Sequence, residues 1–176
     1  MAFEFEILDW FQQLHTPILT WIMKLASRLG DAGFIWVLLA VILLFVPRTR
    51  KVGVMVTVAL ILDMITCNMI LKPLVARTRP YDVNTAIELL IRAPKDFSFP
   101  SGHTAASFAA VSALGFAKEK KLWIPSLVLA VLIGISRMYF YVHYPTDVLA
   151  GMLLGILCGW AAAKVVSYLK KRKEKA

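Results

Sequence analysis

Long apolar segments follow one another along most of this chain and are joined by short polar connections. The segments cover residues 32–46, 52–71, 104–117, 122–142 and 148–169. About 20 helical residues cross a hydrocarbon core of ~30 Å, so the first and third segments reach that length only with residues from their flanks. With 59% hydrophobic and 18% charged residues, a water-soluble domain would carry more apolar surface than it could bury. The sequence therefore predicts an all-α, polytopic membrane helix bundle of five or six helices, in a single domain covering residues 1–176.

The N-terminal stretch, residues 1–31, is predicted to form amphipathic helices. Apolar side chains alternate there with acids and glutamines, and Thr16-Pro17 has the pattern of a helix start with threonine as the N-cap. One broken sixth span and two helices lying in the membrane interface both fit, and Lys24 and Arg28 favour the interface. No cleavable signal peptide is predicted, because the N-terminus has no basic region and no small-residue cleavage site.

The basic residues gather beside the ends of apolar segments. The clusters are Arg48, Arg50 and Lys51; Lys118, Lys120 and Lys121; and Lys164, Lys170, Lys171, Arg172, Lys173 and Lys175. This pattern follows the positive-inside rule, so no nucleic-acid partner is expected despite a net charge of +9. With these clusters and the C-terminus in the cytoplasm, the loop at 77–100 is extracytoplasmic. The expected location is the cell membrane, with a bacterial inner or plasma membrane favoured.

Three short polar runs lie at the opposite ends of the segments from the basic clusters. They are Lys72-(six residues)-Arg79-Pro80, Pro100-Ser101-Gly102-His103 and Ser136-Arg137-(five residues)-His143-(three residues)-Asp147. A single cation at the end of a span is more often a membrane anchor than a ligand. Three cations packed together repel one another unless an anion lies between them. A phosphate would fit, because arginine offers a planar fork to two oxygens and lysine a point charge.

The second and third runs add further polar groups to this end of the molecule. A helix that starts at Pro100-Ser101-Gly102 presents free N–H groups to an anion, although the same pattern alone is an ordinary serine-capped helix start. Asp147 is expected in the first turn of the last span, close enough to hydrogen-bond His143. Such a bond fixes the tautomer and leaves the other ring nitrogen basic. Alone, this pair is more often a satisfied polar contact.

Taken together, the three runs resemble at every specified position the signatures of the type 2 phosphatidic acid phosphatase superfamily. The motifs span residues 72–147, and the segment pattern extends the resemblance over most of the chain, while residues 1–31 contribute nothing to it. The resemblance implies a hydrolase that needs no metal and no other cofactor. Its expected partners are the bilayer and a lipid phosphate or lipid pyrophosphate substrate, and no oligomeric state is predicted.

The resemblance also implies roles for individual residues. His143 would attack phosphorus and form a phosphohistidine, Asp147 would orient it, and His103 would protonate the leaving oxygen and later help to activate water. The remaining motif residues would hold the phosphoryl oxygens: Lys72, Arg79, Ser101, Gly102 and Arg137.

Undecaprenyl pyrophosphate is the favoured substrate, because the site faces outward and small family members have a similar length. Phosphatidylglycerophosphate and phosphatidic acid are close alternatives. Two further alternatives come from other classes. Vanadate-dependent haloperoxidases use a similar constellation but are soluble, and a non-catalytic lipid-binding membrane scaffold would not need both His103 and His143.

Polar residues inside the second segment are also candidates for function. Asp63 is an intramembrane acid, but it precedes Lys72 by nine residues and so lies half a turn off its face in an α-helix. It is therefore expected outside the site, in a structural hydrogen bond. Asn68 precedes Lys72 by four residues and shares its face, where it could orient the lysine.

The glycines, aromatic residues and cysteines of the apolar segments predict how the helices pack and where they meet the membrane interface. The glycine stripe Gly151, Gly155 and Gly159 predicts close helix packing within the monomer in preference to dimerisation. Four aromatic residues near the outer end predict an interfacial aromatic belt or the wall of a lipid-tail groove: Tyr139, Phe140, Tyr141 and Tyr144. Cys67 and Cys158 are expected to be buried as small apolar side chains.

Overall fold

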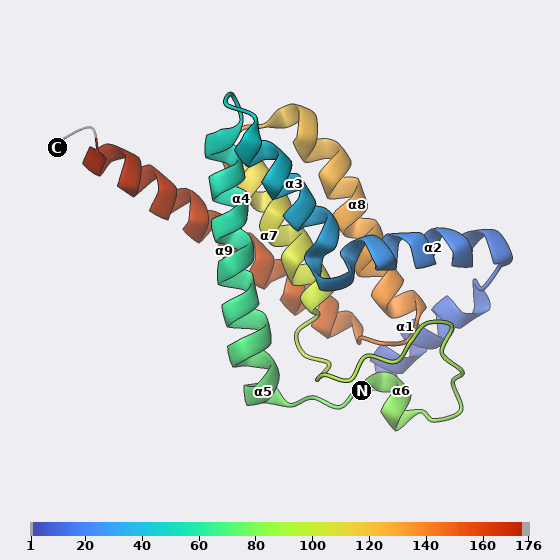
Figure 1. Cartoon of the computed structure of the whole chain (residues 1–176). Coiled ribbons are helices and arrows are strands. Elements are labelled where there is room, and N and C mark those ends of the chain that lie inside the picture. The colour runs from blue at the N-terminus through green and yellow to red at the C-terminus, as the bar shows by residue number, and fades with distance from the viewer. Residues whose placement is uncertain (1, 174–176) are drawn as a thin grey trace.

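The computed structural model describes residues 2–173, which are helical or in connecting loops and turns, with no strand among them. The helices in chain order are α1 (Ala2–Gln13), α2 (Pro17–Gly30), the 3₁₀ turn η1 (Asp31–Gly33), α3 (Phe34–Phe45), α4 (Arg50–Asp63), the π-helical η2 (Met64–Leu71), α5 (Lys72–Val75), α6 (Pro80–Val83), α7 (Gly102–Phe116), α8 (Lys120–Tyr139) and α9 (Pro145–Lys173). Figure 1 shows them gathered in one bundle, which confirms the predicted all-α fold. Lys175 of the C-terminal basic cluster lies outside the described residues.

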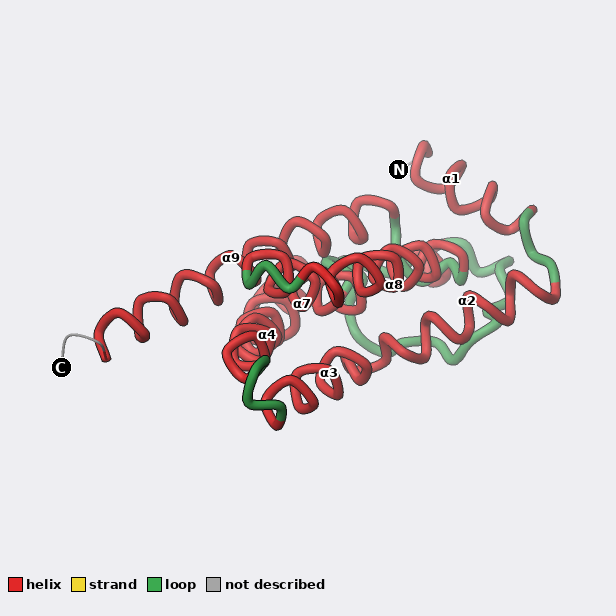
Figure 2. Tube along the Cα trace, turned by 90° about the horizontal axis from the view of Figure 1, so that it is seen from above, coloured by secondary structure: helices red, strands yellow, loops and turns green. Residues whose placement is uncertain are grey.

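Four helical stretches are long and apolar enough to cross a membrane. They are Pro17–Phe45, Arg50–Val83, Lys120–Tyr139 and Pro145–Arg172. The C-terminal half of α9 projects beyond the other helices in both views of the trace (Figures 1 and 2). The predicted multi-pass membrane bundle is therefore confirmed.

The centre of the bundle is α7, which α3, α4, α8 and α9 all contact. Its alanines at positions 105, 109, 110 and 113 are fully buried. The stripe Gly151, Gly155 and Gly159 of α9 lies directly against it, and a Cβ added at Gly155 would lie 2.4 Å from the carbonyl oxygen of Ala105. Small residues on both helices let the two backbones approach closely. The predicted packing of this stripe within the monomer is confirmed.

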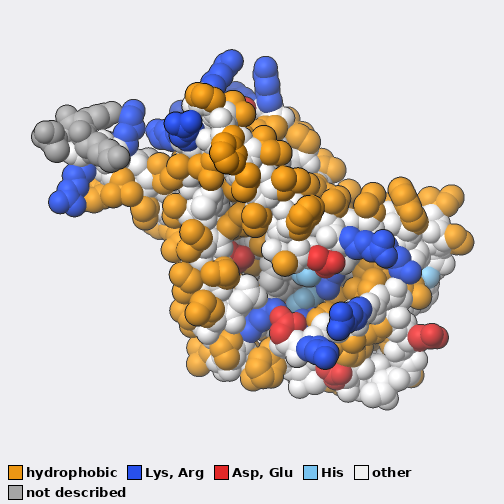
Figure 3. Space-filling model, viewed as in Figure 1, with side chains coloured by type: hydrophobic (Ala, Val, Ile, Leu, Met, Phe, Trp, Pro, Cys, Tyr) orange, Lys and Arg blue, Asp and Glu red, His pale blue; other side chains and the backbone are white. Residues whose placement is uncertain are grey.

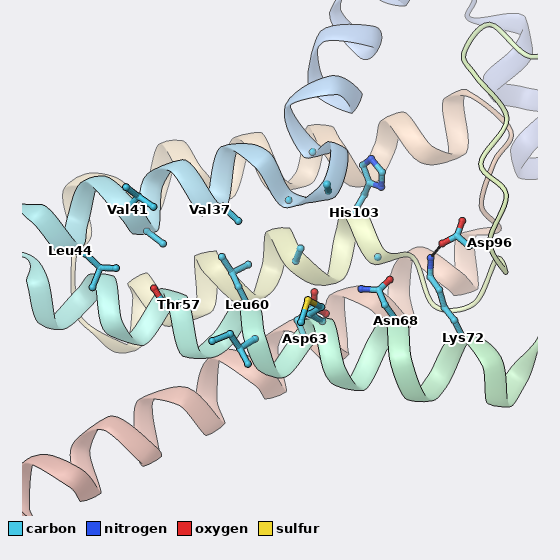
Figure 4. A pocket seen from close by; sticks show the side chains of 18 residues that line it. Val37, Val41, Leu44, Thr57, Leu60, Asp63, Asn68, Lys72, Asp96 and His103 are labelled. Atoms are coloured by element: carbon cyan, nitrogen blue, oxygen red, sulfur yellow. Dashed lines mark hydrogen bonds and ion pairs between the residues drawn. The ribbon is translucent and has the colours of Figure 1, made fainter.

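The helix that begins at Arg50 runs through η2 to Val75, and η2 changes its register. A π-helix bonds residue i to i+5, so each turn holds more residues than an α-turn and the side chains that follow are rotated. Asp63, Asn68 and Lys72 consequently line one cavity (Figure 4). The prediction that Asp63 lies off the face of Lys72 was wrong, because it assumed α-helical rotation throughout. The expected structural hydrogen bond is absent as well, since Oδ1 of Asp63 is buried without a partner.

Two separate helices, α1 and α2, precede α3. Thr16 caps α2 as predicted, and its hydroxyl accepts a hydrogen bond from the backbone N–H of Leu19 at 3.4 Å. At the end of α2 the chain bends through Ala32 and Gly33, whose φ angles are 51° and 70°. This bend sets α2 across the bundle while α3 runs along it (Figure 1).

The predicted aromatic belt was wrong. Tyr139, Phe140, Tyr141 and Tyr144 are no more than 2% exposed. Helix α1 covers part of this set: the ring of Phe5 meets that of Tyr144 edge-on at 5.6 Å, and the Tyr141 hydroxyl donates to Asp9 at 2.7 Å. These aromatic side chains belong to a buried core under the N-terminal helices, because α1 packs on α8 and α9.

Candidate functional site

The three motif runs meet at one end of the bundle, where α5, the start of α7, the end of α8 and the start of α9 converge. Polar contacts connect them directly. Arg79 donates to Nε2 of His143 at 3.3 Å, and Nδ1 of His143 lies 3.5 Å from Oδ2 of Asp147. The backbone N–H of Ser101 donates to the carbonyl of Asp147 at 3.0 Å. Segments far apart in sequence thus form one polar cluster at the end of an apolar bundle.

Asp96 holds two of the motif cations together. Its carboxylate pairs with Lys72, and its Oδ1 accepts from Arg79 at 2.6 Å. Partial burial by itself raises the pKa of Asp96, but its hydrogen bonds to Lys72 and Arg79 and their charges outweigh this and lower the pKa to about 2. The sequence predicted an anion between these cations, and the structure places a carboxylate there.

The His143 imidazole is held neutral and in one orientation. The side chain is only 2% exposed, and this burial, with the nearby charges of Arg79 and Arg137, lowers its pKa to about 3. A guanidinium can only donate, so Nε2 accepts the bond from Arg79 and carries a lone pair. The proton then resides on Nδ1, which faces Asp147 and has no other partner. The predicted pairing of His143 with Asp147 is present at an ion-pair distance, longer than a hydrogen bond.

The Asp147 carboxylate is fully buried and receives several donors. The Ser98 hydroxyl donates to Oδ2 at 2.5 Å and the Tyr144 backbone N–H at 2.9 Å, while Arg77 donates to Oδ1 at 2.5 Å. Arg77 is itself bonded to both carboxylate oxygens of Glu4, at 3.0 and 2.8 Å. These partners satisfy a buried charge that would otherwise be very costly.

The start of α7 brings an open backbone next to Lys72. Ser101 is the N-cap, as predicted, and its hydroxyl oxygen accepts from the backbone N–H of Thr104 at 3.5 Å. At Gly102 an added Cβ would lie 3.2 Å from Oδ1 of Asn68 and 3.7 Å from Nζ of Lys72. A side chain here would fill the space between the helix start and the lysine, so glycine leaves the N–H groups accessible.

His103 and Arg137 each contact a residue that precedes the motifs. Nε2 of His103 lies 2.9 Å from Oδ1 of Asp31. Arg137 is 2% exposed and donates through one terminal nitrogen to the Ser27 hydroxyl at 2.5 Å, whereas its Nε is buried without a partner.

A groove of about 620 Å³ leads away from this cluster between α3 and α4. Lys72, Asp96 and His103 lie at one end of it, and Val41 and Leu44 lie at the other (Figure 4). We call it the α3–α4 groove. Its walls are mostly apolar away from the polar end, so it can accept a hydrocarbon chain whose polar group lies in the cluster.

Sequence reasoning missed several residues of this site. Glu4, Ser27 and Asp31 come from the N-terminal helices and their bend, and each contacts Arg77 or a motif residue. No spacing rule reaches across such distances in the chain. Arg77 did carry a signal, because it is a cation on the side that the positive-inside rule leaves poor in cations. Among the described residues, no three His, Cys, Asp or Glu side chains group as metal ligands.

This chain is similar in sequence and in structure to known membrane phosphatases. The profile of the PAP2 superfamily matches residues 51–171. A curated undecaprenyl-diphosphatase of Sulfolobus acidocaldarius is 29% identical over 167 residues, covering 95% of this chain and 80% of that protein. Two crystal structures superpose on most of the chain at 28% identity. The superposition with Aquifex aeolicus LpxE has a TM-score of 0.79 and covers 93% of this chain and 96% of the LpxE chain. The superposition with the PAP2-type phosphatidylglycerolphosphate phosphatase of Bacillus subtilis has a TM-score of 0.74 and covers 97% of this chain and 86% of the Bacillus chain.

Proposed function

This chain belongs to the PAP2 superfamily and is a multi-pass membrane lipid phosphatase, and we propose that it hydrolyses undecaprenyl pyrophosphate through a phosphohistidine at His143. The observation that carries this proposal is the state of the His143 ring. Arg79 donates to Nε2, and Nδ1 faces Asp147. The nucleophilic lone pair is thereby aimed at the same guanidinium that would hold a phosphoryl group.

The phosphoryl group would take the place of the Asp96 carboxylate. Lys72 and Arg79 already bind an anion there. Arg137, the Ser101 hydroxyl and the Gly102 N–H would complete the cradle, and Arg137 has further N–H donors besides the terminal nitrogen that bonds Ser27. Donors fixed in a dry site stabilise the charge that develops on the phosphoryl oxygens.

Two steps then complete hydrolysis. Nε2 of His143 bonds to phosphorus as the bond to the leaving oxygen breaks, and His103 gives that oxygen a proton. Water next attacks the phosphohistidine while His103 takes a proton from it, which releases inorganic phosphate and the free imidazole. Because Asp31 occupies Nε2 of His103, the nitrogen that exchanges protons with the substrate is Nδ1.

The choice of lipid rests on the relatives and on the α3–α4 groove. Curated relatives named as undecaprenyl-diphosphatases cover most of this chain, and an apolar groove that begins at His103 suits a long hydrocarbon tail. Phosphatidylglycerophosphate is the second candidate, because the phosphatidylglycerolphosphate phosphatase structure covers 97% of this chain.

We further propose that the site is extracytoplasmic, that the C-terminus is cytoplasmic and that α1 and α2 lie in the outer interface. Lys and Arg side chains gather in two places: at the end of the bundle remote from the site, and around the site itself (Figure 3). A cysteine at Asn84 should react with an impermeant thiol reagent in intact cells, and one at Glu119 should not. Both native cysteines are buried and would not interfere. The reverse labelling would place the reaction in the cytoplasm.

The first test of function is phosphate release by purified protein in detergent with EDTA present. The panel comprises undecaprenyl pyrophosphate, phosphatidylglycerophosphate, phosphatidic acid and a water-soluble phosphate ester. His143→Ala should abolish release, whereas His15→Ala, which changes a histidine that bonds the Tyr139 carbonyl outside the site, should retain it. Release that survives His143→Ala would exclude the phosphohistidine. Absence of release from every lipid by folded protein would favour a non-catalytic lipid-binding role.

A further inference from the structure

A second cavity adjoins the motif cluster and shares His103 with the α3–α4 groove. It measures about 740 Å³ and lies between α2 and the loop at 89–95. His103 and Arg137 form part of its wall, and His103 also borders the α3–α4 groove. Figure 3 shows a hollow in this face with a histidine at its floor and both cationic and acidic side chains around it. The two cavities therefore meet at the residue assigned to protonate the leaving oxygen.

The wall of this second cavity is strongly cationic. Four basic residues outside the three motifs line it: Lys24, Arg28, Arg92 and Lys95. None of the ion pairs within residues 2–173 includes any of the four. The acid that lines the cavity, Asp31, is already paired with His103. Cations on the side opposite to the basic clusters run against the positive-inside rule, so an anion is the expected reason for them. We call this cavity the cationic pocket.

Arg137 is the second, independent sign of a ligand. It lines the cationic pocket, is 2% exposed and has an Nε that is buried without an acceptor. A buried donor without a partner is costly, and a charged one more so, which makes an acceptor at this wall favourable. The buried arginine thus connects the cradle of the reacting phosphate with the four cations beyond it.

We propose that the cationic pocket is a subsite for a second phosphate group of the lipid substrate, which makes the enzyme selective for lipid diphosphates. This rests on the proposed function. In a diphosphate the terminal phosphate lies in the cradle facing His143, and the bridging oxygen is the leaving atom beside His103. The other phosphate remains on the lipid and lies beside His103, where the cationic pocket meets the α3–α4 groove that takes the tail. A lipid monophosphate presents no anion there, because its leaving oxygen is bonded to carbon.

The charge balance of the reaction supports the same assignment. When the bridging bond breaks, the electron pair passes to the bridging oxygen of the departing phosphate, which carries extra negative charge until His103 protonates it. Cations in contact with that phosphate are stronger partners of the product-like transition state than of the ground state. Because these side chains are partly exposed, each contributes modestly, and the effect comes from their number.

The experiment compares a lipid diphosphate and a lipid monophosphate that carry the same polyprenyl chain. The variant is Arg28→Gln combined with Lys95→Gln, and the charge-matched control is Lys120→Gln combined with Lys121→Gln at the opposite end of the bundle. Full-length protein is assayed in neutral detergent at fixed ionic strength. We expect kcat/KM for the diphosphate to fall roughly tenfold in the pocket variant, as expected for two partly screened charge-assisted contacts. For the monophosphate it should change less than twofold.

Three outcomes would overturn the subsite. Equal losses on both substrates, or the same loss in the control variant, would mean general attraction to anionic surfaces. Weaker inhibition by inorganic phosphate without any change in substrate selectivity would mean that the pocket serves the released product. Failure of the proposed function is distinct from all of these, because wild-type protein would then show no release that depends on His143.

Discussion

Oδ1 of Asp31 lies 2.9 Å from Nε2 of His103 and so pairs the bend between α2 and α3 with the start of α7. The contact depends on a sharp change of direction at residues 31–33, where Ala32 and Gly33 take positive φ angles. Residue 31 lies outside the stretch that matches the superfamily profile. This second carboxylate–imidazole pair is built by the N-terminal part of the chain and leaves Nδ1 of His103 free for the substrate.

Asp31→Asn is expected to slow phosphoenzyme formation from a lipid phosphate by about tenfold to a hundredfold. The amide no longer stabilises the proton on Nε2, so His103 is a poorer general acid. The rate with p-nitrophenyl phosphate should fall much less, because its leaving group needs no proton. Rapid-quench measurement of the phosphoenzyme across pH tests this. Equal losses on both substrates would mean that Asp31 only supports the fold, and Asp31→Glu should recover part of the rate.

Asp96→Asn is expected to strengthen inhibition by inorganic phosphate, lowering the inhibition constant by roughly tenfold. The Asp96 carboxylate occupies the place between Lys72 and Arg79 that a phosphoryl group would take, and its pKa of about 2 keeps it charged at every physiological pH. An asparagine competes less well for the two cations. Asp82→Asn is the control on the same side of the molecule. Weaker inhibition in the Asp96 variant would show that this carboxylate positions the cations and does not compete with phosphate.

The neutral His143 ring makes stability depend on pH. Its pKa is about 3 in the folded protein and about 6.5 when unfolded, so between these values the unfolded chain binds more protons. Stability should therefore fall as pH decreases from 6.5 towards 3. In His143→Gln this decline should be smaller, which thermal unfolding in detergent between pH 7 and pH 4 would reveal. Parallel curves for the two proteins would contradict a neutral His143, since Asp96 contributes only below about pH 3.8.

Asp63→Leu is expected to stabilise the protein by about 1–3 kcal/mol. The Asp63 side chain is buried in a membrane-spanning helix, and Oδ1 has no hydrogen-bond partner. Leucine removes the desolvated polar group at similar volume. Asp63→Asn keeps a polar group and should give no comparable gain. Denaturant or thermal unfolding of the three proteins in one detergent decides this, and a loss of stability in the leucine variant would show that the carboxyl has a partner in the folded protein.

Residue type and hydropathy were sufficient for the outline of the site. Lys72, Arg79 and Arg137 are recognisable because each is a cation at the outer end of an apolar segment, where only an anion or the interface explains it. Ser101 is recognisable because helix starts have local rules, and α7 begins where those rules predict. These inferences need only neighbours within a few residues.

The errors came from places where the backbone departs from a regular pattern or where a distant element covers the surface. Asp63 faces the same cavity as Lys72 because η2 is π-helical. The apolar sequence of η2 has no periodicity that would predict a π-helix. The aromatic residues near Tyr141 are buried because α1 packs over them. An interfacial belt and a covered core have the same composition.

The amino-acid order alone is enough to predict a membrane bundle with three polar runs at one end and basic clusters at the other. Helix starts and the cost of placing charge in lipid depend on residues close in sequence, so they can be inferred without a structure. The groups that complete the site are visible only in the folded chain. Asp31 reaches His103, Glu4 reaches Arg77, and Asp96 lies between two motif cations. Such pairs join segments 17 to 73 residues apart, and their formation depends on how whole helices pack and bend.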